Sequence, residues 1–192
     1  MGVKLLSKLL KQECKDISKK LHLSELYGKK ICIDASIYLY RFKCNNTLLE
    51  CLFTMCSIFR KYNINVIFVF DGKPGIEKME EINNRREERY NKWVLYDKLK
   101  EKNTLTEKEK NQLYKLKRTL TKIKVDDITL AKNLLDAYGI KYIQATGEAD
   151  KLCASLVNKK KVFGVLSEDM DLFAYGSLNV LRYFSLVTHT VV

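Results

Sequence analysis

The sequence predicts an α/β protein in which helices flank a mostly parallel central sheet. Short apolar runs rich in β-branched residues have the length of buried parallel strands, as in Lys29–Asp34 (KKICID) and Val66–Phe70 (VIFVF). Longer segments with helical periodicity separate these runs, so strands and helices alternate as they do in βαβ units. The chain has 192 residues, of which 46% are hydrophobic, and this suffices for one domain with a sizeable core.

The N-terminal part is expected to contain a helical segment followed by one βαβ unit. The first thirty residues are basic and helical in pattern, with leucines on one face and lysines on the other. Lys29–Asp34 is the first strand, Leu48–Tyr62 a buried helix and Val66–Phe70 the second strand. Asp34 and Asp71 then stand at the carboxyl ends of the two strands, where open α/β sheets place their ligand sites. Taken alone, Asp71 followed by glycine is also an ordinary turn signal.

Positive charge is concentrated in residues 77–124. This segment contains 15 Lys and Arg against 9 Asp and Glu, so half of the net charge of +12 lies in a quarter of the chain. Gly75–Lys100 has a long, largely polar helical pattern, and a capping box of Thr106 and Glu109 opens a second helix that extends to Ile123. Helices that are polar nearly all round bury a face poorly. The pair is therefore either a solvated helical hairpin or a basic arm through which nucleic acid passes.

Two cations at the start of this arm are candidates for contact with a phosphate. Lys78 and Arg85 are seven residues apart, which places them two turns apart on one helix face. Cations held in this way stabilise the charge that develops on a phosphate during its reaction.

The C-terminal third continues the alternation of helices and strands. A helix through Tyr138 meets Gly139, a residue suited to the left-handed end of a helix. Leu186–Val192 alternates like a further strand, which would be an unpaired apolar edge. In chain order, the elements expected before this last strand are the helix Asp127–Tyr138, the strand Lys141–Gln144, the helix Asp150–Lys159 and the strands Val162–Ser167 and Val180–Phe184.

Acidic residues recur where these strands end. A strand sends residues i and i+2 to the same face, so Asp169 and Asp171 can converge while Glu168 points away. Any one pair could be loop acids in water, but six carboxylates from four segments at one sheet edge need a compensating cation. This arrangement predicts metal-dependent phosphodiester chemistry with two divalent ions ~4 Å apart. The six acids are Asp34, Asp71, Glu148, Asp150, Asp169 and Asp171.

The composition indicates which kinds of partner and which cellular compartment to expect. A net charge of +12 favours a polyanionic partner, nucleic acid first and an anionic membrane second. The six cysteines contain no C-x-x-C pair and only two histidines are present, which argues against zinc and disulfides. A reducing intracellular compartment is therefore expected. No apolar run reaches the ~18 residues of a membrane span, and the N-terminus has no signal-peptide pattern.

The motifs, taken together, resemble those of one enzyme family. They are Met1-Gly2-Val3, Ile33-Asp34-Ala35-Ser36 with Tyr40, Val69-Phe70-Asp71-Gly72-Lys73-Pro74, Gly147-Glu148-Ala149-Asp150 and Ser167-Glu168-Asp169-Met170-Asp171. In this order and at this spacing, the chain is similar to the N-terminal nuclease portion of the structure-specific 5′ nucleases, closest to flap endonuclease.

The resemblance implies a PIN-like 5′ nuclease fold in which residues 1–192 form a single nuclease domain. The basic arm, at about 73–126, would be an inserted helical arch. The implied activity is hydrolysis of phosphodiester bonds at DNA flaps and single-strand/duplex junctions, in replication and repair. Two Mg²⁺ ions, for which Mn²⁺ substitutes, would be the cofactor. The location would be the nucleus if the source is eukaryotic, and a sliding clamp or a C-terminal partner is left open.

The resemblance also assigns roles to particular residues. All six acids would ligate metal, although Asp150 stands where many family members have Glu. Lys78 and Arg85 would contact the scissile phosphate as catalytic residues. A nucleobase would stack on Tyr40, and Gly2 would lie near the site. The expected nucleic-acid-binding residues are Gly2, Tyr40, Lys78, Arg85, Arg86 and Arg89.

One departure from the family pattern leaves a second hypothesis open. The sequence stops at Val192, before the family's further metal-ligating Asp and its helix–three-turn–helix region, which grips duplex DNA. The alternative is therefore a noncatalytic nucleic-acid-binding protein that retains the nuclease fold. Six intact carboxylates favour the nuclease, because clustered acids repel phosphate and give a pure binder no advantage.

Overall fold

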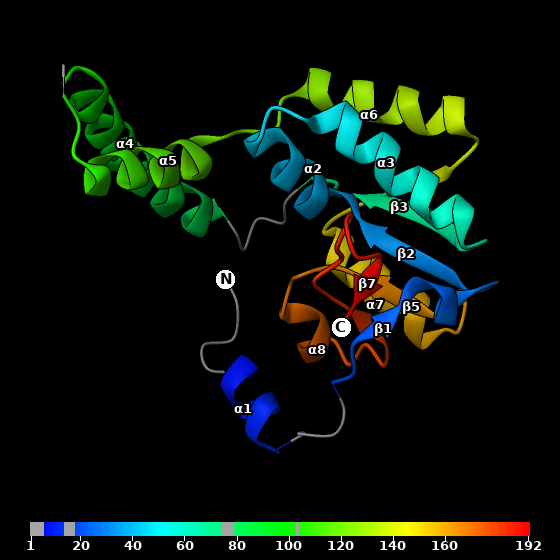
Figure 1. Ribbon diagram of the computed structural model, residues 1–192. Coiled ribbons are helices and arrows are strands. Elements are labelled where there is room, and N and C mark those ends of the chain that lie inside the picture. The colour runs from blue at the N-terminus through cyan, green and yellow to red at the C-terminus, as the bar shows by residue number, and fades with distance from the viewer. Residues whose placement is uncertain (1–5, 14–17, 74–78, 103) are drawn as a thin grey trace.

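A computed structural model describes residues 6–13, 18–73, 79–102 and 104–192, and it confirms the predicted α/β class (Figure 1). Five parallel strands form the central sheet in the order β4-β3-β2-β5-β6. Because β2 is the middle strand, with β3 and β5 as its neighbours, the residues that follow these three strands lie side by side at one edge. The strands are β2 (Lys30–Asp34), β3 (Asn65–Phe70), β4 (Lys141–Gln144), β5 (Gly164–Leu166) and β6 (Val180–Leu181).

Helices cover both faces of the sheet. They are α2 (Ala35–Cys44), α3 (Leu48–Lys61), α6 (Val125–Tyr138), α7 (Ala149–Asn158) and α8 (Asp171–Ala174). Side chains alternate along a strand, so Ile31 and Ile33 of β2 enter the core with α2, α3 and α6, whereas Cys32 enters the core with α7 and α8. Figure 1 shows these two helical layers on either side of the strands. The left-handed stop predicted at the end of α6 is confirmed, because Gly139 has a φ of 70°.

The ends of the chain differ from the sequence prediction. The first thirty residues were predicted to be helical. Among those that the structure describes, α1 (Leu6–Glu13) is the only α-helix, and β1 (Leu21–His22) and the 3₁₀ helix η1 (Leu23–Leu26) follow it. The predicted strand Leu186–Val192 shrinks to β7 (Thr190–Val191), which pairs antiparallel with β1. The expectation of an unpaired edge was therefore wrong. Val191 is fully buried in the main core, and this burial fixes the pairing of two segments far apart in sequence.

Helix α2 was not predicted from the sequence. Helix α2 begins directly after β2, and the side chain of Asp34 accepts a hydrogen bond from the Ser36 backbone N–H (3.0 Å) as its N-cap. Tyr38, Leu39 and Phe42 recur at helical spacing and are buried in the main core.

The basic segment forms the two predicted helices, α4 (Met79–Lys100) and α5 (Glu107–Leu120). They contact each other, and Figure 1 shows the pair projecting away from the sheet as an arm. The predicted capping box is present, because the Thr106 hydroxyl accepts from the Glu109 backbone and the Glu109 carboxylate accepts from the Thr106 backbone. Among the described residues, no helix has the length and apolar content to cross a bilayer.

Candidate metal centre and nucleic-acid interface

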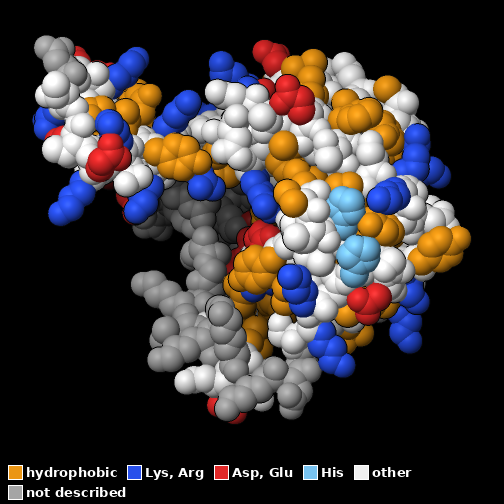
Figure 2. All heavy atoms as spheres, in the orientation of Figure 1, with side chains coloured by type: hydrophobic (Ala, Val, Ile, Leu, Met, Phe, Trp, Pro, Cys, Tyr) orange, Lys and Arg blue, Asp and Glu red, His pale blue; other side chains and the backbone are white. Residues whose placement is uncertain are grey.

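Carboxylates gather at the carboxyl edge of the sheet because parallel strands all end there. Asp34 is the last residue of β2, and Asp71 directly follows β3. Glu148 and Asp150 stand at the start of α7, after β4, and Asp169 and Asp171 follow β5. Figure 2 shows acidic side chains on the inner wall of the hollow between the arm and the body.

Asp34 is the most deeply buried of these acids, with 4% of its surface exposed. Its Oδ1 accepts from the Ser36 backbone N–H, and its Oδ2 accepts from the Ser167 hydroxyl (3.0 Å). Burial, and then repulsion from Asp71, raises the pKa of Asp34 to about 6. The hydrogen bonds oppose this rise, because they stabilise the ionised carboxylate.

Asp71 is fixed by contacts with two other elements. Its Oδ2 accepts from the Ser36 hydroxyl (2.5 Å), and its Oδ1 accepts from the Ala149 backbone N–H (2.8 Å) at the start of α7. The Gln144 side chain donates to the Asp71 carbonyl. Ser36 therefore links Asp34 to Asp71, since its backbone and its hydroxyl bind one carboxylate each.

Gly72 allows the chain after β3 to pass close to the chain after β4. Its backbone N–H donates to the Gly147 carbonyl (2.6 Å). A Cβ at this position would lie 2.1 Å from the carbonyl oxygen of Ala145, so only glycine fits without a backbone shift. This close approach brings Asp71 to the amino end of α7, where Glu148 and Asp150 lie.

Asp150 is the acid whose environment is most strongly unfavourable to charge. Its Oδ1 is buried and has no hydrogen-bond partner among the residues that the structure describes. Burial, and then repulsion from Asp34, Asp169, Asp71 and Glu148 in that order, raises its pKa to about 8. Four of the other predicted ligands therefore lie within electrostatic reach of Asp150.

The last pair of acids does not sit on a strand, contrary to the i, i+2 argument. Strand β5 ends at Leu166, residues 167–170 form a loop, and Asp171 is the first residue of α8. The two are joined locally, because the Asp171 backbone N–H donates to Asp169 Oδ1 (2.9 Å). Glu168 does turn elsewhere, since its carboxylate accepts from the Tyr183 backbone N–H (2.8 Å).

These groups suit a cation, although they do not yet surround one. Among the described residues, no three His, Cys, Asp or Glu side chains converge closely enough to hold a metal ion. Without a cation, burial and then mutual repulsion disfavour the charged carboxylates, and both raise the pKa of Asp150. The buried oxygen of Asp150 that lacks a partner would gain one from a divalent ion, for which carboxylate oxygens are the preferred ligands.

Sequence reasoning missed the residues that support the acids. Ser36 and Ser167 donate hydroxyl hydrogen bonds to Asp71 and Asp34, and Gln144 holds the backbone at Asp71. A usable signal was present, because each serine lies one or two residues beyond the end of a strand and two residues from a candidate ligand.

Tyr40 stands between the acidic edge and the arm. Its hydroxyl donates to the Arg118 carbonyl of α5 (2.5 Å). Burial raises the pKa of Tyr40, Cys44 adds to the rise, and the guanidinium groups of Arg89 and Arg118 oppose it. A pocket of about 610 Å³ extends from Tyr40 to Asp71. Its lining consists of Ser36, Ile37, Leu39, Tyr40, Phe70, Asp71, Gly72, Ile123, Ile128 and Gln144.

Four of the predicted nucleic-acid-binding residues cannot be placed relative to the acids. Gly2 and Lys78 lie outside the described residues, and so do the side chains of Arg85 and Arg86. Arg89 is described, half-buried on α4, and within electrostatic reach of the Tyr40 hydroxyl.

Comparison with known proteins identifies the family. The XPG N-terminal domain matches residues 1–92, and the XPG I-region matches residues 139–190. The flap endonuclease 1 of Lodderomyces elongisporus is 33% identical over 201 residues, covering 96% of this chain and 51% of that protein. The chain belongs to the XPG family of nucleases. Its two matched regions contain all six predicted metal ligands, whereas most of the arm lies between them.

Solved structures of two other proteins share the fold. The catalytic core of Rad2 in complex with DNA substrate has a TM-score of 0.72 at 24% identity, covering 99% of this chain and 54% of that one. The Holliday junction-resolving enzyme GEN1, in complex with product DNA and Mg²⁺ and Mn²⁺ ions, has a TM-score of 0.61 at 21% identity, covering 99% and 39%. The chain spans about half the length of the curated relatives it matches.

Proposed function

We propose that this chain is the nuclease portion of a divalent-metal-dependent, structure-specific 5′ nuclease. Its substrates would be DNA flaps and single-strand/duplex junctions. The observation that carries the proposal is the buried Oδ1 of Asp150, which has no hydrogen-bond partner in the described part of the chain and lies within electrostatic reach of four other carboxylates. A fold built only for stability gains nothing from such a group.

The six acids would hold the metal. Asp34, Asp71 and Asp150 come from three segments at the centre of the edge, and Glu148, Asp169 and Asp171 complete the set. Bound Mg²⁺, one or two ions with Mn²⁺ as a substitute, would activate the attacking water and stabilise the leaving oxygen. The hydroxyls of Ser36 and Ser167 hold two of the carboxylates in fixed orientations, so less reorganisation is needed when a phosphate arrives.

The DNA would approach between the arm and the acidic edge. A pocket lined by both Tyr40 and Asp71 supports this path, and a nucleobase would stack on the Tyr40 ring. Lys78 and Arg85 would contact the scissile phosphate, with Arg86, Arg89 and Gly2 as further contacts. A net charge of +12 supports a polyanionic substrate. The protein would act in an intracellular, reducing compartment, which is the nucleus in a eukaryote. Binding to a sliding clamp is an open prediction.

The test is cleavage of matched flap, duplex and single-strand DNA substrates in Mg²⁺, Mn²⁺ and EDTA. We expect metal-dependent cutting that favours the flap, and its loss in Asp150→Asn while DNA binding in EDTA is retained. Binding without cleavage in either metal would instead support the noncatalytic nucleic-acid-binding protein.

A further inference from the structure

The two histidines of the chain meet at one hydroxyl group, although they are far apart in sequence. His22 lies in β1, and His189 directly precedes β7. His189 Nδ1 lies 2.9 Å from the Tyr62 hydroxyl oxygen, and His22 Nε2 lies 3.5 Å from the same oxygen. The sum of these two distances is the upper limit on the separation of the two nitrogens. Two imidazole rings therefore present a nitrogen atom to one small region of the surface.

Backbone contacts hold the two imidazoles in this arrangement. His22 pairs with Thr190 where β1 meets β7, and the Leu23 backbone N–H donates to the His189 carbonyl (2.9 Å). Tyr62, at the end of α3, packs edge-on between the two rings. Its ring centroid lies 5.2 Å from that of His22 and 5.6 Å from that of His189. The convergence is thus fixed by three segments of the fold.

Ser24 provides an oxygen partner for the other nitrogen of His22. The Ser24 hydroxyl oxygen lies 2.8 Å from His22 Nδ1, and the Ser24 backbone N–H also approaches this nitrogen, at 3.3 Å. When Nδ1 carries the hydrogen, it donates to the hydroxyl, and the lone pair of Nε2 is then available toward Tyr62. Histidines that ligate metals commonly donate their second N–H to an oxygen in this way.

We propose that His22 and His189 together bind a divalent transition-metal ion, for which Zn²⁺ is the simplest probe. Imidazole nitrogen suits Zn²⁺, Cu²⁺ and Ni²⁺, whereas Mg²⁺ prefers oxygen ligands. No third His, Cys, Asp or Glu of the described residues converges with the pair, so water and the Tyr62 hydroxyl would complete the coordination. The scarcity of histidines argues only against a site with four protein ligands, because the sequence does not show that two distant histidines meet.

The surroundings allow an ion to reach the pair from water. His22 is exposed, and His189 and Tyr62 are half-buried. The Glu25 carboxylate accepts from the His22 backbone N–H (2.9 Å) and places a negative charge near the site. Lys61 opposes it, because its ammonium lies over the Tyr62 ring, 5.5 Å from the centroid. Figure 2 shows the histidine side chains next to each other on the surface of the body.

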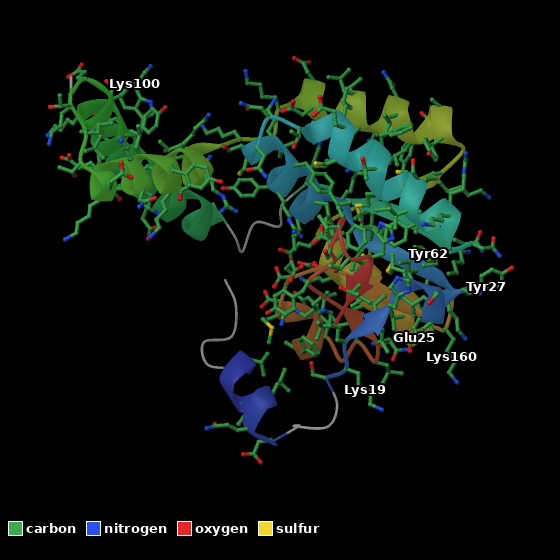
Figure 3. The ribbon with its side chains drawn as sticks, in the orientation of Figure 1. Lys19, Glu25, Tyr27, Tyr62, Lys100 and Lys160 are labelled. Atoms are coloured by element: carbon green, nitrogen blue, oxygen red, sulfur yellow. The ribbon has the colours of Figure 1, made fainter. Side chains whose placement is uncertain are left out.

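This site lies away from the acidic edge. Tyr62 precedes β3 and Asp71 follows it, and a strand of six residues spans about 20 Å. Figure 3 shows Tyr62 on the side of the body away from the arm, whose outer tip is marked by Lys100. The inference therefore does not depend on the proposed nuclease activity. A bound ion would join β1, the end of α3 and the segment before β7.

The presence of only two histidines makes the site directly observable. The ring-nitrogen NMR signals of the isotope-labelled chain would be followed while Zn²⁺ is added at about pH 8, where imidazoles are mainly neutral and able to ligate. Millimolar Mg²⁺ would be present throughout to occupy the acidic edge. We expect the signals of both rings to shift together and to saturate with one equivalent of Zn²⁺. Mg²⁺ alone should leave them in place.

Three variants locate the ion. His22→Asn and His189→Asn should each weaken Zn²⁺ binding about tenfold or more, since losing even an outer partner of a ligating histidine costs ~10–100-fold. Asparagine preserves the N-cap role of His22 and tolerates the positive φ of His189, 51°. Asp150→Asn is the control for the acidic edge and should leave the ring shifts unchanged.

The ring signals and the melting temperature decide the result together. Zn²⁺ should raise the melting temperature of the wild type in Mg²⁺ and have little effect on either histidine variant. Ring signals that stay in place at saturating Zn²⁺ would overturn the site, as would wild-type Zn²⁺ affinity in both histidine variants. The wild-type ring titration decides the question by itself if a variant fails to fold. DNA cleavage does not enter any of these measurements, so failure of the proposed nuclease function would leave the result intact.

Discussion

Replacing Asp150 by Asn should make the metal-free protein more stable at neutral pH. The pKa of Asp150 is raised from 3.8 to about 8 in the folded chain, chiefly by burial. Between these values the folded state binds a proton that the unfolded state has released. The stability associated with this proton is fully present below pH 3.8, and it is lost as the pH rises through about 8. Asparagine has no charge to bury, so the variant does not lose it.

The size of this effect follows from the shift. At pH 7, which is about three units above the ordinary pKa of an Asp side chain, the unfolding free energy of the wild type is ~4 kcal/mol lower than it is below that pKa. Asp150 is only half-buried, and solvent screening of the repulsion reduces this to roughly 2 kcal/mol. For a chain of this size the melting temperature should then rise by about 4–8 °C.

The assay is thermal unfolding in EDTA from pH 5 to pH 8, repeated with millimolar Mg²⁺. The difference between Asp150→Asn and the wild type should grow with pH in EDTA. Mg²⁺ should raise the wild-type melting temperature by linkage, and the variant should respond much less. Asp126→Asn is the control, because Asp126 also lies in the first turn of a helix but on the exposed side of α6. Its loss should slightly destabilise the chain, by about 0.3–1 kcal/mol. A variant no more stable than the wild type at pH 8 would refute the account of the site.

Two further changes test the arm and the sheet edge. Arg85→Ala should slow cleavage far more than it weakens binding, whereas Lys108→Ala should mainly weaken DNA binding and reduce its salt dependence; equal losses of rate and affinity in both would mean that the arm supplies only bulk charge. Gly72→Ala should destabilise the fold by roughly 2 kcal/mol or more in urea unfolding, because its Cβ would meet the Ala145 carbonyl at 2.1 Å. Gly147→Ala, where no atom of the described residues lies within 4 Å of the added Cβ, should be close to neutral.

Local patterns predicted the parts of the fold that local physics decides. The strands Lys30–Asp34 and Lys141–Gln144 were placed to within one residue, because buried parallel strands are short apolar runs with clear ends. Gly139 and the Thr106 capping box were found because each satisfies the end of its own helix. The gathering of acids at one edge followed from the parallel order of the strands, without any knowledge of side-chain contacts.

Contacts between distant segments decided the rest. The pairing of β1 with β7 joins residues almost 170 positions apart. A two-residue strand is too short for its sequence pattern to predict which strand it pairs with. The same holds within the site, where Ser167 donates to Asp34 across 133 residues and Tyr40 donates to Arg118 across 78. Serine and tyrosine are common on loops and helix surfaces, so composition does not distinguish these two from the others.

Contacts between distant segments also determine how the acids of the candidate site differ from one another, which a list of the acids does not show. The six carboxylates identify a place where charge accumulates, but Ser36, Ser167 and Gly72 determine which carboxylates are held and which remain available. Asp34 and Asp71 have both oxygens engaged by protein donors, whereas Asp150 has a buried oxygen that no donor of the described residues reaches. The unfavourable charge is thus concentrated on the one acid that a cation can relieve most. It follows that metal affinity should depend more on Asp150 than on either of the two hydrogen-bonded aspartates.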